Sequence, residues 1–173
     1  MEESVMATVL LHGEPVSTCG ELPQKGDTIA PFTLVGTDLK ECGTCCCSEG
    51  KKVILNIFPS VDTPVCATSV RQFNQKAGSC PNVAVFCISM DLPFALGRFC
   101  GAEGLEKVKS LSAFRNPEFG EKLGVRIVNG PLAGLFARAV VVLDEKGVVL
   151  HSELVPEITQ EPDYNAAMKV LSC

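Results

Sequence analysis

The sequence predicts an α/β protein with three layers, a mixed central sheet and an N-terminal β-hairpin. Residues 52–58 and 83–90 are strongly apolar runs with the length and composition of buried strands. Residues 64–77 between them have helical character, and a strand–helix–strand unit needs a crossover that makes its two strands parallel. Residues 140–143 and 148–150 flank a polar turn and predict an antiparallel hairpin. A parallel pair joined to an antiparallel hairpin gives a mixed sheet.

Shorter elements are expected around this core. Residues 5–11 and 15–18 lie on either side of Gly13 and Glu14 and predict the N-terminal hairpin. The remaining expected elements are a strand at 32–35, a polar cysteine-rich loop at 41–50, a short helix or loop at 94–104, a strand at 108–113, a short helix at 117–123 and an amphipathic helix at 163–171. This order is typical of a thioredoxin-like fold, and 173 residues fit a single domain, 1–173.

Composition and charge narrow the classes of partner. The net charge is −5 and there is no basic run, which argues against a nucleic-acid partner. Residues 5–11 are apolar but far too short to span a bilayer, so no membrane partner is expected. They also lack the basic flank and small-residue cleavage site of a signal peptide. We therefore expect a cytoplasmic protein.

Ten cysteines are unusual for such a chain. In a reducing compartment a disulfide framework is not expected, so each cysteine is interpreted separately as a core residue, a metal ligand or a catalyst. Cys87 lies inside an apolar run and is expected to be inert. Cys19 and Cys80 stand in turn-like stretches without a motif, and Cys173 is expected to be an exposed chain end.

Cys66 is the candidate nucleophile. Residues 58–66 run from the end of a buried strand, through a turn, into the first turn of a helix, with Thr63 as N-cap and Pro64 at the first helical position. Binding sites in open α/β sheets gather at the carboxyl ends of the strands. A helix N-terminus favours the thiolate, which is the nucleophilic form of cysteine. The alternative is that Cys66 is a buried core residue.

Peroxide reduction is the chemistry that this position suits. A thiolate attacks one peroxide oxygen, and the other oxygen leaves as water or alkoxide. The Thr63 hydroxyl, main-chain N–H groups near Cys66 and an arginine are the expected donors to the leaving oxygen. The resulting sulfenic acid condenses with a second thiol and releases water.

Several motifs resemble one family over nearly the whole chain. Residues 59–66, 91–94, 98–104 and 137–142 are similar, in this order, to the bacterial thiol peroxidases, the atypical two-cysteine branch of the peroxiredoxins. The similarity continues through residues 114–117, 130–132 and 157–164.

The resemblance implies a role for four residues. Cys66 matches the peroxidatic cysteine, Cys100 the resolving cysteine of the same chain, Thr63 the motif threonine and Arg138 the active-site arginine. It also implies a homodimer that reduces hydrogen peroxide and alkyl hydroperoxides, is recycled by thioredoxin, and uses no metal or organic cofactor. Without the resemblance, Arg138 at a strand end is more often a solvated or salt-bridged residue.

A disulfide between Cys66 and Cys100 makes a further demand on the structure. The two Cα atoms must come within about 7 Å, although the cysteines are predicted on separate elements. We therefore expect local unwinding of one or both segments before the bond can form.

The Cys42–Cys47 cluster has no counterpart in this family. Cys42 and Cys45 have the spacing of a redox dithiol and of half a zinc site, and Cys46 and Cys47 follow directly. A structural metal, an accessory disulfide and a reduced surface loop all remain open.

Two other functions are weighed against the peroxidase. One is a metal-binding module built on the Cys42–Cys47 cluster, although His12 and His151 lack metal-ligand spacing. The other is a thiol–disulfide oxidoreductase, which normally carries a Cys-x-x-Cys pair at the strand-to-helix turn. Here Cys66 is followed by Ala67, Thr68 and Ser69, so the second cysteine is missing.

Overall fold

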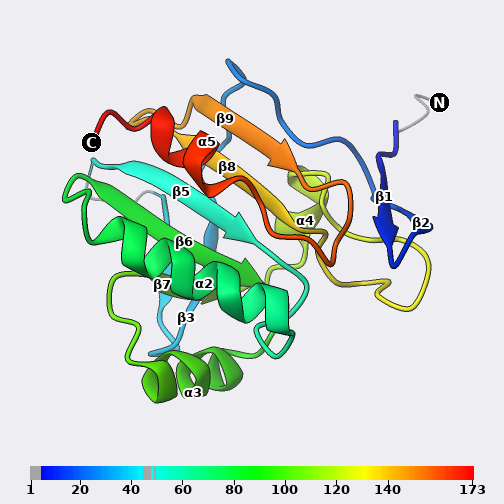
Figure 1. The fold of residues 1–173 in the computed structure, drawn as a ribbon, viewed down its shortest axis with the longest axis horizontal. Helices are drawn as coiled ribbons and strands as arrows, with labels where there is room; N and C mark the ends of the chain where they lie inside the picture. Colours follow the sequence, from blue (N-terminus) through cyan, green and yellow to red (C-terminus); the bar gives the residue numbers. More distant parts are fainter. Residues whose placement is uncertain (1–4, 45–47, 49) are drawn as a thin grey trace.

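A seven-stranded mixed sheet forms the centre of the computed structural model, which describes residues 5–44, 48 and 50–173 (Figure 1). The strand order is β4-β3-β7-β6-β5-β8-β9. The strands are β3 (Thr33–Gly36), β4 (Glu41–Gly43), β5 (Lys52–Ile57), β6 (Val83–Ser89), β7 (Lys109–Ser112), β8 (Ala139–Leu143) and β9 (Val149–Leu154).

The three middle strands are parallel, as the sequence predicts for the first two. Strand β5 pairs with β6 in the register Ile54↔Val85, and β6 pairs in parallel with β7. Antiparallel strands lie on both sides of this parallel core, because β8 pairs with β5 and β3 pairs with β7. The predicted mixed sheet is therefore confirmed, with an antiparallel pair at each edge rather than at one.

Strand β4 corrects the expectation of a loop over residues 41–50. Residues Glu41–Gly43 form an edge strand that pairs antiparallel with β3, and Leu34 lies opposite Cys42. A hairpin with β3 supplies backbone partners that composition alone does not reveal. Residues 45–47 and 49 of the expected loop lie outside the described residues.

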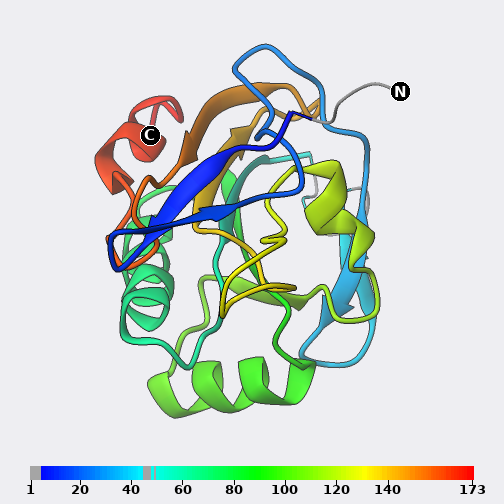
Figure 2. The same ribbon diagram turned by 90° about the vertical axis from the view of Figure 1, so that its right-hand side faces the viewer.

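Helices cover both faces of the sheet, as Figure 2 shows. They are α2 (Pro64–Ala77), α3 (Pro93–Glu103), α4 (Glu118–Lys122) and α5 (Tyr164–Lys169). Helices α2 and α5 lie on one face, α4 lies on the other, and α3 packs at the end of the sheet near β7. Helix α5 is shorter than the predicted 163–171. Asp163 is its N-cap and accepts a hydrogen bond from the Ala166 N–H, and Val170 is its C-cap.

Alternation along the buried strands divides the core in two. In β5, Ile54 packs with Val70 and Phe73 of α2, whereas Leu55 faces the opposite layer with Phe119 of α4. Successive side chains of a strand point to opposite faces, so the apolar run of β5 supplies both layers at once.

The N-terminal hairpin forms a separate two-stranded sheet. Strands β1 (Thr8–Leu11) and β2 (Glu14–Ser17) pair antiparallel, which confirms the predicted hairpin. The hairpin lies on the side of the main sheet toward which β5 points (Figure 1). It is anchored there by hydrogen bonds from Leu10 N to Pro156 O, 2.7 Å, and from Ile158 N to Leu10 O, 2.8 Å.

A disulfide between Cys80 and Cys173 joins the chain end to the turn after α2. The two Cα atoms are 5.5 Å apart, and the edge of Phe73 in α2 packs on Tyr164 in α5 nearby in the same interface. The sequence predicts no role for Cys80 and only an exposed chain end for Cys173, so this disulfide is a finding of the structure. Residues 93 positions apart in sequence meet only when α5 docks on α2, which no local pattern encodes.

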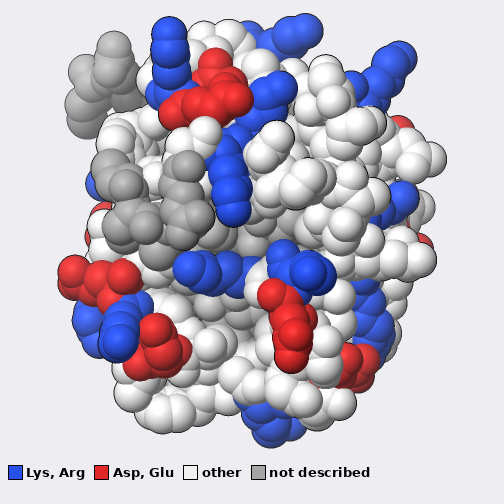
Figure 3. Space-filling model, turned by 90° about the vertical axis from the view of Figure 1, so that its left-hand side faces the viewer, with Lys and Arg blue, Asp and Glu red and all other residues white. Residues whose placement is uncertain are grey.

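The surface is charged without a dominant sign on the face shown in Figure 3. Basic and acidic side chains are interspersed across that face. In the part of the chain that the structure describes, no helix has the length and apolar character needed to cross a membrane.

Candidate active site

Cys66 lies in the first turn of α2 and its side chain is wholly buried. Pro64 occupies the start of the helix as predicted, since its missing N–H would have no helical partner there. Thr63 is the N-cap residue, and its carbonyl accepts the first helical bond from Ala67 N. Its side chain does not cap the helix, however. The Thr63 hydroxyl donates instead to the carbonyl of Ser60, 2.9 Å away, which leaves the hydroxyl lone pairs free to accept.

Arg138 is buried against Cys66, with only 2% of its surface exposed. Its Nη2 donates to Cys66 Sγ over 3.2 Å, and its Nε donates to the Ile158 carbonyl over 2.8 Å. The guanidinium therefore places a fixed positive charge in contact with the Cys66 sulfur. The solvated reading of a strand-end arginine is therefore wrong, because Arg138 immediately precedes β8 and points into the interior.

One donor of Arg138 is left over. Its Nη1 is buried and has no hydrogen-bond partner among the described residues. Buried polar groups without partners are rare in folded proteins and often mark a place where a ligand or water binds. The guanidinium thus holds the sulfur with one nitrogen and offers another to a second molecule.

A cavity of about 410 Å³ reaches this guanidinium. Thr63 and Arg138 supply polar groups to it, and most of its wall is apolar, including Leu132, Leu135 and Ile158. It opens beside Pro59 and Ser60, which follow the carboxyl end of β5, where sites in such sheets are expected. The cavity suits a small polar group attached to a hydrocarbon chain.

The loop before α2 is fixed by Asp91, which follows the parallel strand β6. The Asp91 carboxylate accepts from Ser60 Oγ over 2.7 Å, from Val61 N over 2.8 Å and from Ser89 Oγ over 2.6 Å. Asp91 thus holds the loop that precedes Cys66. It belongs to the motif at residues 91–94, but the sequence analysis gave it no role of its own. Its position at the end of a strand adjacent to β5 was the available signal.

Cys100 lies in the last turn of α3, half-buried, with Sγ 3.2 Å from Ser110 Oγ. Burial raises the pKa of this thiol above its ordinary value. Cys66 and Cys100 are both free thiols in this structure, and they stand on separate helices. The structure thus brings Arg138 and Cys66 into contact but does not join Cys66 to Cys100.

Two ion pairs link the neighbourhoods of the two thiols. Arg71 of α2 makes a two-pronged contact with Glu103 of α3, at 2.9 and 3.0 Å, and Arg98 of α3 contacts Asp62 at 2.8 Å. The Arg71 guanidinium also lies over the Phe99 ring, 5.6 Å from its centroid. These contacts hold α3 against the start of α2 in the reduced form.

The other cysteines differ in their surroundings. Cys87 is buried in β6, as expected, and burial raises its pKa to about 12, so this thiol is inert at neutral pH. Cys42 is buried in β4 and is disulfide-bonded, whereas residues 45–47 of the cluster lie outside the described part. Within the described residues, no three His, Cys, Asp or Glu side chains are grouped as metal ligands would be.

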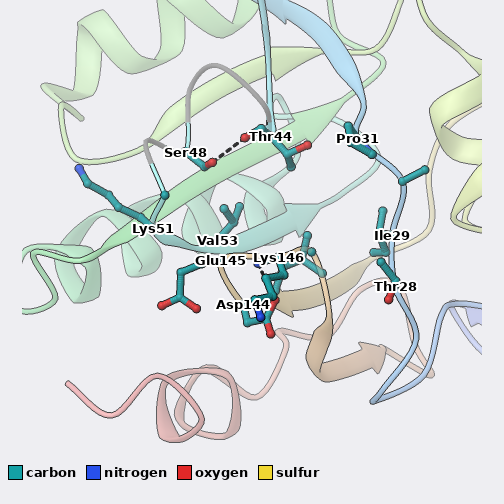
Figure 4. Close-up of a pocket in the computed structure, with 14 residues that line it drawn as sticks. Thr28, Ile29, Pro31, Thr44, Ser48, Lys51, Val53, Asp144, Glu145 and Lys146 are labelled. Atoms are coloured by element: carbon teal, nitrogen blue, oxygen red, sulfur yellow. Dashed lines mark hydrogen bonds between the residues drawn. The ribbon is translucent and has the colours of Figure 1, made fainter.

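A second cavity, of about 360 Å³, lies at the opposite end of β5 (Figure 4). Lys51 and Val53 border it near the start of β5, and Glu145 and Lys146 border it in the β8–β9 turn. Its described lining includes no thiol, and it lies at the amino end of a parallel strand. The cavity at Arg138 is therefore the candidate active site.

The fold and the cysteine–arginine pair define a thiol-based redox protein of the thioredoxin-like class. The model of the Redoxin family matches residues 24–168 of this chain. A thiol peroxidase from Corynebacterium glutamicum is 54% identical over 167 residues, which are 96% of this chain and all of that protein.

Solved structures agree with this relationship. A peroxiredoxin-like protein from Aquifex aeolicus is 40% identical, with a TM-score of 0.88, over 95% of this chain and 96% of that one. A thiol peroxidase from Chromobacterium violaceum is 26% identical, with a TM-score of 0.87, over 98% and 96%. The chain belongs to the redoxin family, among its thiol peroxidases.

Proposed function

We propose that this thiol-dependent peroxidase reduces hydrogen peroxide and alkyl hydroperoxides through a sulfenic acid on Cys66. The observation that carries the proposal is the buried contact between Cys66 and Arg138, an arginine that also lines a cavity with largely apolar walls. The cation lies in contact with the sulfur, and the cavity receives a peroxide together with its hydrocarbon group.

The peroxide is held between Arg138 and Thr63 in this proposal. Thr63 Oγ1 already gives its proton to the Ser60 carbonyl, so it accepts a hydrogen bond from the peroxide O–H. The unpaired Nη1 of Arg138 donates to the peroxide oxygens and stabilises the negative charge that develops on the leaving oxygen. The Cys66 thiolate attacks the nearer oxygen, the O–O bond breaks, and the leaving oxygen takes up a proton as water or alcohol.

Cys100 resolves the sulfenic acid. Its sulfur attacks Cys66, the S–OH bond breaks, water leaves, and an intrachain disulfide forms. The start of α2 and part of α3 must unwind first, because Cys66 is wholly buried and Cys100 is held beside Ser110. Thioredoxin, itself a dithiol, is the proposed reductant that returns both cysteines to thiols.

A homodimer is part of the proposal. Four large apolar residues line one surface cavity, and each is between 46% and 70% exposed. They are Leu39, Leu92, Phe94 and Phe114. Contiguous exposed apolar surface of this kind marks an interaction site. Sedimentation velocity tests this assignment: Phe94→Asp is expected to convert a dimer to a monomer, and a monomeric parent protein contradicts it.

We also propose a cytoplasmic location, where thioredoxin is available as reductant. The Cys80–Cys173 disulfide bears against this location, since stable disulfides are rare in the reducing cytosol. Fractionation of the producing cells tests it, and recovery of the protein outside the cytoplasmic fraction contradicts it.

Hydroperoxide consumption with thioredoxin, thioredoxin reductase and NADPH tests the central proposal. Cys66→Ser is expected to be inactive, and Cys100→Ser is expected to form a sulfenic acid, detected by dimedone adduction, without turning over. Cys87→Ser is the matched control, because Cys87 is a buried thiol of raised pKa outside the cavity, and it should retain activity. Activity that survives in Cys66→Ser contradicts the proposal.

A further inference from the structure

The tip of the N-terminal hairpin forms one wall of the active-site cavity. Leu11, the last residue of β1, and His12, which follows it in the turn, line the cavity from the hairpin. Thr63 and Arg138, which face the peroxide group in the proposed function, line the same cavity from the main domain. The hairpin therefore contacts whatever is attached to the peroxide rather than the reacting oxygens.

The Glu157 carboxylate holds this tip in place. Its Oε1 accepts from His12 N over 2.9 Å, and its Oε2 accepts from Gly13 N over 3.1 Å. The Thr159 hydroxyl also donates to Oε1, over 2.7 Å, and further restrains the carboxylate. One side chain thus accepts hydrogen bonds from both N–H groups of the turn, although it lies 145 residues from His12 in the sequence.

The turn has a conformation that benefits from such a partner. His12 has φ of 51° and Gly13 has φ of 83°, so two successive residues adopt the left-handed region. This region is unfavourable for a residue with a side chain such as His12. In this turn the His12 and Gly13 N–H groups are each satisfied by one oxygen of the Glu157 carboxylate.

The same segment also positions the catalytic arginine. Ile158, next to Glu157, accepts from Arg138 Nε over 2.8 Å and donates its own N–H to Leu10 O over 2.8 Å. The two anchors are chemically separate. The main chain of Ile158 holds both the arginine and the hairpin strand, whereas the side chain of Glu157 holds the hairpin tip and does not contact the arginine.

We propose that Glu157 is a positioning residue that sets the preference for organic hydroperoxides over hydrogen peroxide. It fixes Leu11 and His12 against the hydrocarbon group of the substrate. Hydrogen peroxide has no such group, so its reaction does not depend on the hairpin tip. This inference rests on the proposed function, because it concerns the substrate range of the same cavity.

Steady-state kinetics with cumene hydroperoxide and hydrogen peroxide test the inference in Glu157→Gln and Glu157→Ala. Glu14→Gln is the matched control, since Glu14 is an exposed carboxylate that follows the same turn. We expect KM for cumene hydroperoxide to rise about tenfold in Glu157→Ala, with a smaller rise in Glu157→Gln. The KM for hydrogen peroxide and kcat for both substrates should stay within about twofold of the parent.

Leu11→Ala provides a second route that leaves Glu157 intact. It should raise KM for cumene hydroperoxide alone, and Glu157→Ala added to it should have little further effect, since both act through one wall. Equal changes for both peroxides in Glu157→Ala, or no change for either, overturn the inference. A parent protein that reduces neither peroxide defeats the proposed function instead, so the two failures are distinguishable.

Discussion

Arg138 lies against Cys66, with Nη2 3.2 Å from Sγ, although the two residues are 72 positions apart in the sequence. The contact forms because α2 and β8 both start at the end of the sheet where β5 finishes. Burial makes the pair effective, since water does not screen a charge that is 2% exposed. One guanidinium thus contacts the Cys66 sulfur and also carries a donor that has no partner among the described residues.

Arg138→Lys should nearly abolish peroxide reduction while keeping a positive charge at the site. An ammonium group cannot contact Cys66, the Ile158 carbonyl and a peroxide at the same time as a planar guanidinium can. Loss of one transition-state donor typically lowers the rate by about 10²–10³-fold. The rate of Cys66 sulfenic-acid formation in stopped flow measures this. A variant that is folded by circular dichroism and within tenfold of the parent contradicts the role of Arg138.

The Arg71–Glu103 contact should slow disulfide formation. It ties α2 to α3, and both helices must open before Cys66 and Cys100 can join. Exposed ion pairs are weak, so Glu103→Gln should speed the resolving step by no more than about fivefold. Sulfinic-acid formation at high peroxide should fall accordingly, because it competes with resolution. Mass spectrometry follows both products, with Glu106→Gln as an exposed control. An unchanged ratio of disulfide to sulfinic acid argues against this latch.

Glu157 should make stability depend on pH at its acidic end. Hydrogen bonds, chiefly from the Thr159 hydroxyl and then from the Gly13 and His12 amides, lower its pKa to about 2. The unfolded value is about 4.3, so its stabilising contribution is complete above that pH and is lost as pH falls toward 2. Urea unfolding of the parent and Glu157→Gln should therefore show a gap at pH 7 that narrows below about pH 4.3. A gap that is constant from pH 7 to pH 3 contradicts this account.

The Cys80–Cys173 disulfide should stabilise the fold appreciably. Its sequence separation is 93 residues, and closing a loop of this size constrains the unfolded chain by up to about 4.7 kcal/mol. Cys173→Ser is the suitable variant because Cys173 is exposed and its replacement leaves the core intact. We expect its free energy of unfolding, measured in urea without reductant, to fall by about 2–4.7 kcal/mol. Equal stability of the parent and Cys173→Ser contradicts a structural disulfide.

Local patterns predicted the parts of this fold that local interactions specify. The apolar runs became β5 and β6, and the proline at position 64 marked the start of the helix that carries Cys66. The periodicity of apolar residues, the length of a segment and its turn residues are properties of short stretches of sequence. They can therefore be read without knowledge of the tertiary structure. The position of Cys66 at the carboxyl end of β5 followed from those same signals.

Contacts between distant segments were not predictable in this way. The edge strand β4 depends on pairing with β3, and the Cys80–Cys173 bond depends on the docking of α5. Arg138 was found through family resemblance, yet its anchor is the main-chain carbonyl of Ile158, which has no residue-type signature. Glu157 was part of a quoted motif, but its partners are backbone amides of a turn at the other end of the chain.

Peptide mapping after one equivalent of peroxide tests the central claim most directly. The reduced protein would be treated with hydrogen peroxide, alkylated, digested without reductant and analysed by mass spectrometry. The account predicts a new peptide pair linking Cys66 to Cys100, while Cys87 is recovered as a thiol. Oxidation that leaves Cys66 and Cys100 alkylated, or that links Cys66 to a different cysteine, would contradict it.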